Sequence, residues 1–219
     1  MNKNILIIQP GRLGDIIICL PIAKHYFDKG YEVDWLCPIE FHEMFRNVSY
    51  CKPVTTISKH YHDVIDMSFG FNGAPEMWWQ ITKPRWESFV DAKYHLARVS
   101  LDEKWNLVWD RDTKKEDALF TELNLPENYI VYHSQGSRES FTLNLPKNHP
   151  AIEFKKVAGY NVFDWYKVLS KAKEIHCIDS VLVNFVDSAL PEFNPKYFHN
   201  VQNYKIPDLT VKKGWIEKC

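Results

Sequence analysis

The first 37 residues alternate sharply between apolar runs and polar turns. Asn4–Gln9 (NILIIQ) is a short, β-branched apolar run, which is typical of a buried parallel strand. From Gly14 onward, apolar residues recur at helical spacing until Gly30, a helix-stop residue. Glu32–Cys37 (EVDWLC) is predicted to be a second strand. This succession predicts a βαβ unit, whose strands are parallel and whose crossover is right-handed.

The rest of the first half has shorter patterns. They predict two helices and two strands, namely helices at Phe41–Phe45 and Glu87–Val99 and strands at Val54–Ile57 and Val64–Met67. The segment from Phe69 to Trp86 is an aromatic-rich loop. Residues 101–127 are rich in charge and contain Pro126, which marks them as a connector.

The second half begins with another apolar strand, Tyr129–His133, followed by a polar loop, Ser134–Ser140. Strands and helices then alternate again, as strand Ile152–Val157, helix Phe163–Lys173, strand Glu174–Ile178 and helix Val181–Leu190. The chain is therefore predicted to be an α/β protein with two Rossmann-like halves, residues 1–100 and 128–219. Ligands of such folds bind outside the carboxyl ends of the parallel strands.

Composition narrows the class of protein. Of the 219 residues, 45% are hydrophobic and 25% are charged, which is typical of a folded globular chain. The net charge of −1 argues against nucleic acid as the main partner, because nucleic-acid binders usually carry a basic face. The many aromatic side chains could form a homodimer interface as well as a core.

Cysteine usage and hydropathy predict the compartment. The five cysteines form no C-x-x-C pair, and two of them lie in apolar runs, which favours reduced thiols over disulfides or a zinc site. The two apolar runs near the N-terminus are interrupted by Gln9, Arg12 and Asp15, so neither is long enough for a membrane span. We expect a cytoplasmic protein without a membrane span.

The first chemical motif lies between the first strand and the first helix. Gly11 and Gly14 allow a tight turn and a close approach of backbone to a ligand, and Arg12 lies between them. Asp15 follows at the helix N-terminus, where the helix dipole favours an ionised carboxylate. It could act as a general base, or it could simply cap the helix. The loop matches neither the dinucleotide fingerprint nor the P-loop.

The second chemical motif joins the last predicted strand and helix. Asp179, Ser180 and Val181 place a hydroxyl and backbone N–H groups at a helix N-terminus, which can bind a phosphate or only cap the helix. His133 ends a strand at the same predicted edge and could contact a ligand there.

Together the two motifs resemble glycosyltransferase family 9, the bacterial heptosyltransferases and their relatives. The opening ILIIQPGRLGDIIICLPIAKHY is similar to the start of that family through Gly14, Asp15 and Pro21. IHCIDSVLVNFVDSAL is similar to its later Asp-Thr-Gly-Leu-x-His motif. Here Val181 replaces the glycine and Asn184 replaces the histidine.

The resemblance implies a shortened GT-B-like fold and a glycosyltransferase that uses a nucleotide-sugar donor, inverts the anomeric centre and needs no metal or other cofactor. It implies that Asp15 deprotonates the acceptor hydroxyl, whose identity is unknown. The donor diphosphate would be held by Ser180 and its neighbours, with Arg138 as the first candidate for a basic partner and Lys147 as the second. Two alternatives remain open: a non-catalytic nucleotide- or sugar-binding relative, and a phage-type DNA-base glycosyltransferase.

Overall fold

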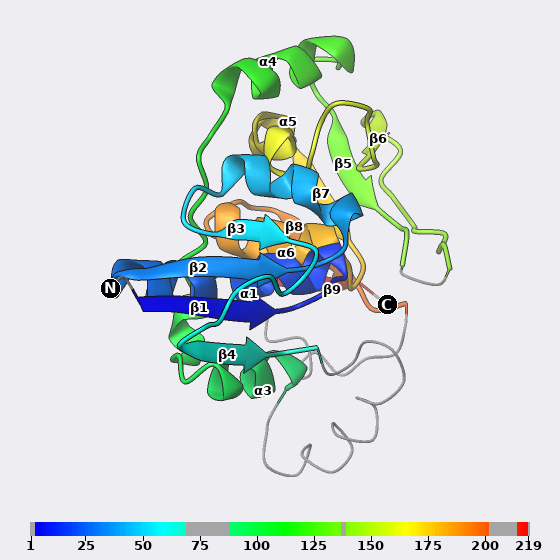
Figure 1. The fold of residues 1–219 in the computed structure, drawn as a ribbon. Coiled ribbons are helices and arrows are strands. Elements are labelled where there is room, and N and C mark those ends of the chain that lie inside the picture. Colours follow the sequence, from blue (N-terminus) through cyan, green and yellow to red (C-terminus); the bar gives the residue numbers. More distant parts are fainter. Residues whose placement is uncertain (1–2, 69–87, 137–138, 202–213, 219) are drawn as a thin grey trace. The chain divides into compact units, whose positions relative to one another are not determined.

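The computed structural model describes residues 3–68, 88–136, 139–201 and 214–218. The chain divides into two compact units, Met1–Asp110 and Arg111–Cys219. Each unit is built around one parallel sheet with helices packed on it (Figure 1). The predicted α/β class with two Rossmann-like halves is confirmed.

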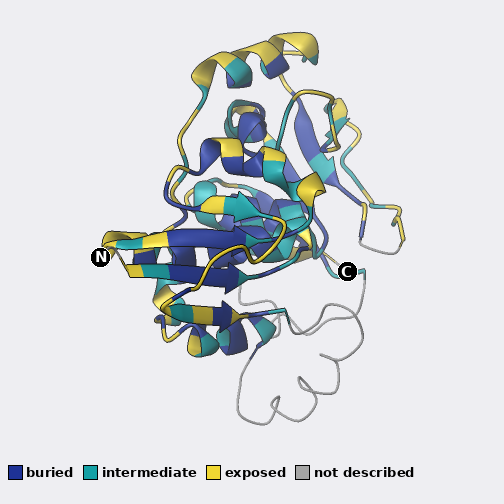
Figure 2. Cartoon of the chain, viewed as in Figure 1, coloured by how far each residue is buried: buried dark blue, intermediate teal, exposed yellow. Residues whose placement is uncertain are grey.

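The sheet of the first unit has the strand order β3-β2-β1-β4, and all of its pairs are parallel. Its strands are β1 (Lys3–Ile8), β2 (Tyr31–Leu36), β3 (Lys52–Val54) and β4 (Asp63–Asp66). The two central strands carry the longest apolar runs, because they are covered on both faces. Ile5, Leu6, Ile7 and Trp35 have no exposed surface, and β1 and β2 are largely buried in Figure 2.

Four described helices belong to this unit. They are α1 (Leu13–Asp28), the 3-10 helices η1 (Ile39–Asn47) and η3 (Leu101–Trp105), and α3 (Phe89–Leu96). Helix α3 is anchored to α1 near its C-terminal end, since the Tyr94 hydroxyl donates to the Ile18 carbonyl at 2.7 Å and the Tyr26 hydroxyl donates to the Ala97 carbonyl at 2.7 Å. These bonds hold α3 against α1.

The sheet of the second unit has the order β6-β5-β7-β8-β9 and is also parallel throughout. Its strands are β5 (Ile130–His133), β6 (Ala151–Glu153), β7 (Glu174–Cys177), β8 (Lys196–His199) and β9 (Trp215–Lys218). The described helices of this unit are α4 (Thr113–Glu122), the 3-10 turn η4 (Phe163–Trp165), α5 (Tyr166–Lys171) and α6 (Val181–Ala189). Helix α4 lies within the stretch that its charge marked as a connector.

Most of the predicted elements are present. Helices α4 and η3, in the stretch predicted to be a connector, were not predicted, and β6 ends at Glu153 rather than at Val157. The strand predicted at Val54–Ile57 was misplaced: β3 ends at Val54, and Ile57 is 59% exposed. Strands β8 and β9 were not predicted. The aromatic loop from Phe69 to Trp86 lies outside the described residues.

Each sheet contains one point at which the chain reverses its direction of winding. In the first unit the chain runs outward from β1 through β2 to β3 and then returns to the other side of β1 as β4. In the second unit, β5 pairs with β6 on one side, and β7, β8 and β9 follow on the other. Such switch points, at the carboxyl ends of the strands, are where open α/β sheets bind ligands.

Candidate functional site

The candidate residues of the first unit lie at its switch point between β1 and β4. The chain leaves β1 through Gln9, turns at Gly11 and enters α1. Gly11 has a φ of +135°, which side-chain-bearing residues rarely adopt, and a Cβ added there would lie 2.6 Å from Cε2 of Phe41. The turn therefore requires glycine for both its backbone conformation and its packing.

Asp15 lies in the first turn of α1, which Arg12 caps. The backbone N–H of Arg12 donates to Oδ2 of Asp15 at 3.1 Å, so the carboxylate does cap the helix. Asp15 and Gly14 are half-buried, whereas Arg12 is exposed. A carboxylate has a second oxygen with its own lone pairs, so the capping bond leaves Asp15 able to accept a proton.

Two opposing influences act on the pKa of Asp15. Burial, the larger of the two, raises that pKa above its ordinary value because it penalises the charged form. The positive charge of Lys93, the Arg12 N–H and the Arg12 charge all lower it. The net result is a raised pKa, which brings this carboxylate closer to the range in which general bases work.

Lys93, on α3, belongs to this site but was not predicted. Its side chain has no exposed surface, and its ammonium donates to the Met67 carbonyl at 2.9 Å and to Oε1 of Gln9. The Gln9 amide in turn donates to the Gly11 carbonyl at 2.8 Å. A signal for Lys93 existed in the sequence, since it lies three residues after Val90 on the apolar face of the predicted helix.

The candidate residues of the second unit lie at its switch point between β5 and β7. His133 is the last residue of β5, and Ser180 follows β7 as the residue that caps α6. Nδ1 of His133 and Oγ of Ser180 are 2.8 Å apart. The structure thus joins two residues that the sequence singled out separately.

His133 is a neutral imidazole at physiological pH. It is buried, with its ring edge-to-face against Phe154 at a centroid distance of 5.3 Å. Burial lowers its pKa to about 4. At pH 7 it therefore presents one N–H donor and one acceptor nitrogen rather than a positive charge.

Helix α6 begins with a polar cap and an apolar body. The side chain of Ser180 makes no capping bond to the helix and bonds to His133 instead. The first turn contains no acidic residue. An α-helix leaves its first N–H groups without helical partners, so this terminus is suited to binding an anion. Asp179 and Val181, on either side of Ser180, are half-buried.

The remaining donor-side candidates are Arg138 and Lys147. Arg138 lies outside the described residues, and Lys147 is exposed in the segment between β5 and β6. Asn184 donates from Nδ2 to the Ser180 carbonyl at 3.2 Å, within its own helix.

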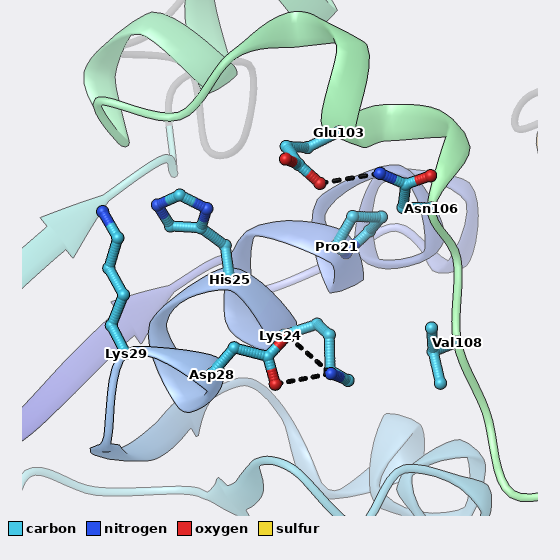
Figure 3. Close-up of a pocket in the computed structure, with 8 residues that line it drawn as sticks. All are labelled: Pro21, Lys24, His25, Asp28, Lys29, Glu103, Asn106 and Val108. Carbon is cyan, nitrogen blue, oxygen red and sulfur yellow. Dashed lines mark hydrogen bonds and ion pairs between the residues drawn. The ribbon is translucent and has the colours of Figure 1, made fainter.

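A surface hollow of 370 Å³ lies elsewhere on the first unit (Figure 3). It is lined by the second half of α1 and the η3 region, through Pro21, Lys24, His25, Asp28, Lys29, Glu103, Asn106 and Val108. Within it, Lys24 is already neutralised by Asp28 at 2.5 Å. This hollow lies toward the end of α1 opposite Asp15, so it is separate from the candidate site.

Metal-ligating side chains do not cluster in the described part of the chain. Across those residues, no three His, Cys, Asp or Glu side chains gather in a way that could hold a metal ion. None of the described helices combines the length and apolarity needed to cross a bilayer. Cys19, Cys37, Cys51 and Cys177 are free and buried.

Comparison with solved structures defines the fold. No protein-family model and no curated protein matches the sequence. The E. coli heptosyltransferase WaaC with ADP is similar over 97% of this chain and 94% of its own, with a TM-score of 0.52 and 13% identity. The fold is that of the heptosyltransferases.

Two further structures with the heptosyltransferase fold agree. The glycosyl transferase family 9 protein from Veillonella parvula matches over 99% of this chain and 86% of its own, with a TM-score of 0.52 and 8% identity. The iron-containing dodecameric glycosyltransferase TibC from enterotoxigenic E. coli matches over 98% of this chain and 64% of its own, with a TM-score of 0.59 and 10% identity. The resemblance inferred from the sequence is thus confirmed at the level of the fold.

Proposed function

We propose that this protein is a glycosyltransferase that moves a sugar from a nucleotide-sugar donor to a hydroxyl acceptor, with inversion and without a metal ion. The observation that carries the proposal is the position of Asp15. It is a half-buried carboxylate at the β1/β4 switch point of a chain that has the heptosyltransferase fold. The same fold occurs in glycosyltransferases whose structures contain ADP or an ADP-sugar.

In this mechanism Asp15 is the general base. The acceptor oxygen attacks the anomeric carbon while its proton passes to the Asp15 carboxylate. The bond between the anomeric carbon and the diphosphate oxygen breaks at the same time, and that oxygen leaves with the electron pair. A single displacement of this kind inverts the anomeric configuration.

The second unit supplies the groups suited to the leaving diphosphate. Ser180 offers a hydroxyl, and the first N–H groups of α6 offer donors in a field that favours negative charge. The neutral His133 adds hydrogen-bonding capacity without competing charge. Fixed donors at a developing anion are among the strongest catalytic contributions. Asp179, Val181 and Arg138 remain predictions for donor binding.

The donor is a co-substrate rather than a resident cofactor, and ADP-linked sugars are the first class to test. A cytoplasmic location remains a prediction. A homodimer remains a prediction.

The first experiment measures thermal stability with ADP, UDP, GDP, CMP and their sugars. A nucleotide present at about 100 times its dissociation constant stabilises the folded state by about 2.7 kcal/mol. We expect a selective shift that is weakened in Ser180→Ala. Ser170→Ala is the matched control, since that hydroxyl bonds to the Lys167 carbonyl in α5 and should leave the shift unchanged. If none of the nucleotides shifts the melting temperature, the proposal is contradicted.

The second experiment measures sugar transfer by Asp15→Ala, using the donor so identified and a panel of hydroxyl acceptors. Loss of a general base lowers the rate by about 10²–10⁴-fold, while nucleotide binding should persist. Asp28→Ala, on the exposed end of the same helix, is the control and should transfer normally. Normal turnover in Asp15→Ala excludes the base role.

A second candidate is a non-catalytic nucleotide- or sugar-binding protein. It is favoured by the sequence of α6, where Asn184 replaces the family's histidine and bonds back to its own helix. Selective donor binding without turnover on any acceptor would decide for this alternative.

A further inference from the structure

Lys93 is a fully buried lysine at the β1/β4 switch point. Lysine is almost never completely buried unless its charge is paired. Its place is fixed by the adjacent Tyr94, whose hydroxyl bonds to the Ile18 carbonyl of α1. The backbone therefore holds the Lys93 side chain inside the unit.

The contacts of Lys93 are those of a charged ammonium. It donates to the Met67 carbonyl at 2.9 Å and to Oε1 of Gln9, and it lies 4.4 Å from the centroid of the Phe89 ring. A carbonyl oxygen, an amide oxygen and an aromatic face all favour a cation. The ammonium thereby connects the chain leaving β1 with the chain leaving β4.

The titratable groups around Lys93 come from two elements besides its own. Helix α1 supplies Asp15 and Cys19, and β4 supplies Asp66. Burial raises the pKa of Cys19 to about 12, so that thiol is neutral at pH 7. Asp66 is exposed and accepts the backbone N–H of Ser68 at 2.9 Å. Of the two carboxylates, Asp15 is half-buried and Asp66 is exposed. The charge of Lys93 therefore affects Asp15 more than Asp66.

We propose that Lys93 is a positioning residue for Asp15: its buried ammonium pairs electrostatically with the carboxylate, and its bond to Gln9 holds the loop that carries Asp15. This rests on the proposed function, in which Asp15 must begin the reaction deprotonated. Gln9 completes the connection, because its amide donates to the Gly11 carbonyl while the next residue, Arg12, donates its N–H to Asp15.

The test is a double-mutant cycle on unfolding in urea, with Lys93→Met and Asp15→Asn separately and together. At pH 7, Lys93→Met should lower the urea midpoint by about 0.5–1 M more in the wild-type background than in the Asp15→Asn background. That difference should shrink as the pH falls from 7 to 4, because protonation of Asp15 removes its charge. A purely structural lysine would show no such pH dependence.

Lys104 provides a matched control in the same unit. It is nearly as buried and lies 3.8 Å from the Trp105 ring centroid, but it is not among the groups that affect the pKa of Asp15. Lys104→Met should therefore have the same effect in the wild-type and Asp15→Asn backgrounds. Lys93→Gln, which keeps an N–H donor and loses the charge, is the second variant should Lys93→Met fail to fold.

The outcomes separate this inference from the proposed function. Equal effects of the Lys93 variants in both backgrounds at every pH overturn the positioning role, whatever the enzyme does. A pH-dependent difference establishes the pairing even if Asp15→Ala retains transfer, in which case the base assignment alone fails.

Discussion

Replacing Gly11 by alanine tests how the turn in front of Asp15 is held. The substitution adds one methyl group at a backbone φ of +135°. That methyl carbon would lie 2.6 Å from Cε2 and 2.9 Å from Cζ of the Phe41 ring, both closer than real contacts allow. The variant therefore imposes a backbone penalty and a packing penalty, and the two can be measured separately.

The size of each penalty follows from the geometry. A residue other than glycine in this backbone region costs about 1–3 kcal/mol. Forcing a methyl group against a ring that must move costs about 1–3 kcal/mol more. The lower entropy of the unfolded alanine chain offsets about 0.4–1 kcal/mol. We expect Gly11→Ala to lower the free energy of unfolding by about 3 kcal/mol.

The assay is urea denaturation of Gly11→Ala, Phe41→Ala and the double variant. Removing the Phe41 ring should abolish the packing penalty, so that Gly11→Ala costs about 1–2 kcal/mol in that background. A loss below about 0.5 kcal/mol in the single variant would refute the strained turn. Equal losses in both backgrounds would refute the ring contact while leaving the backbone argument intact.

Three further perturbations follow from single contacts. The pKa of His133 is about 4 in the folded state and about 6.5 in the unfolded state, so the free energy of unfolding falls as the pH drops from 6.5 to 4. His133→Phe should remove about 3 kcal/mol of this pH dependence, as measured by urea titrations at several pH values. Arg111→Met removes the bidentate partner of the buried Glu116 carboxylate and should lower the free energy of unfolding by about 3 kcal/mol at pH 7. Adding Glu116→Gln removes the unpaired charge and should recover part of that loss. Trp35→Phe removes the indole N–H that donates to the Gln9 carbonyl at 3.0 Å and should cost about 2 kcal/mol by the same assay; no measurable loss would mean that this bond does not hold Gln9.

The central strands were predictable from their apolar residues. β1, β2, β5 and β7 lie inside their sheets, and most of their residues are buried. Burial of a strand and its apolar pattern have the same physical cause, so the sequence pattern is sufficient to locate such strands.

The strands that were missed or misplaced lie toward the sheet edges. β9 (WIEK) is an edge strand with three of its four residues exposed, so no hydrophobic alternation was required. β8 (KYFH) includes a fully buried lysine, Lys196, whose ammonium donates to the Pro191 carbonyl at 2.8 Å. β3 pairs with β2 over only three residues. In each case the strand is defined by pairing with a distant segment, which a local pattern does not contain.

Part of the candidate site was predictable, because some of its residues lie beside local sequence signals. Asp15 and Ser180 stand next to strong local signals, a strand end and a helix start, so spacing along the chain found them. Lys93 is far from Asp15 in the sequence, and its role depends on the packing of α3 against α1. A lysine on an apolar helix face signals a buried charge but does not say which carboxylate it meets.

The two switch points differ in a way that suits a displacement reaction. The first presents a half-buried carboxylate whose ionised form is favoured by the charge of a buried lysine, so that it begins the reaction able to accept a proton. The second presents a hydroxyl, a neutral imidazole and a helix N-terminus without an acidic residue in its first turn, which is an arrangement for receiving negative charge. A sugar transfer needs both, because the acceptor loses a proton while the diphosphate gains charge. A protein that only bound nucleotides would need the second alone, so the buried Lys93 beside Asp15 is the feature that argues for catalysis.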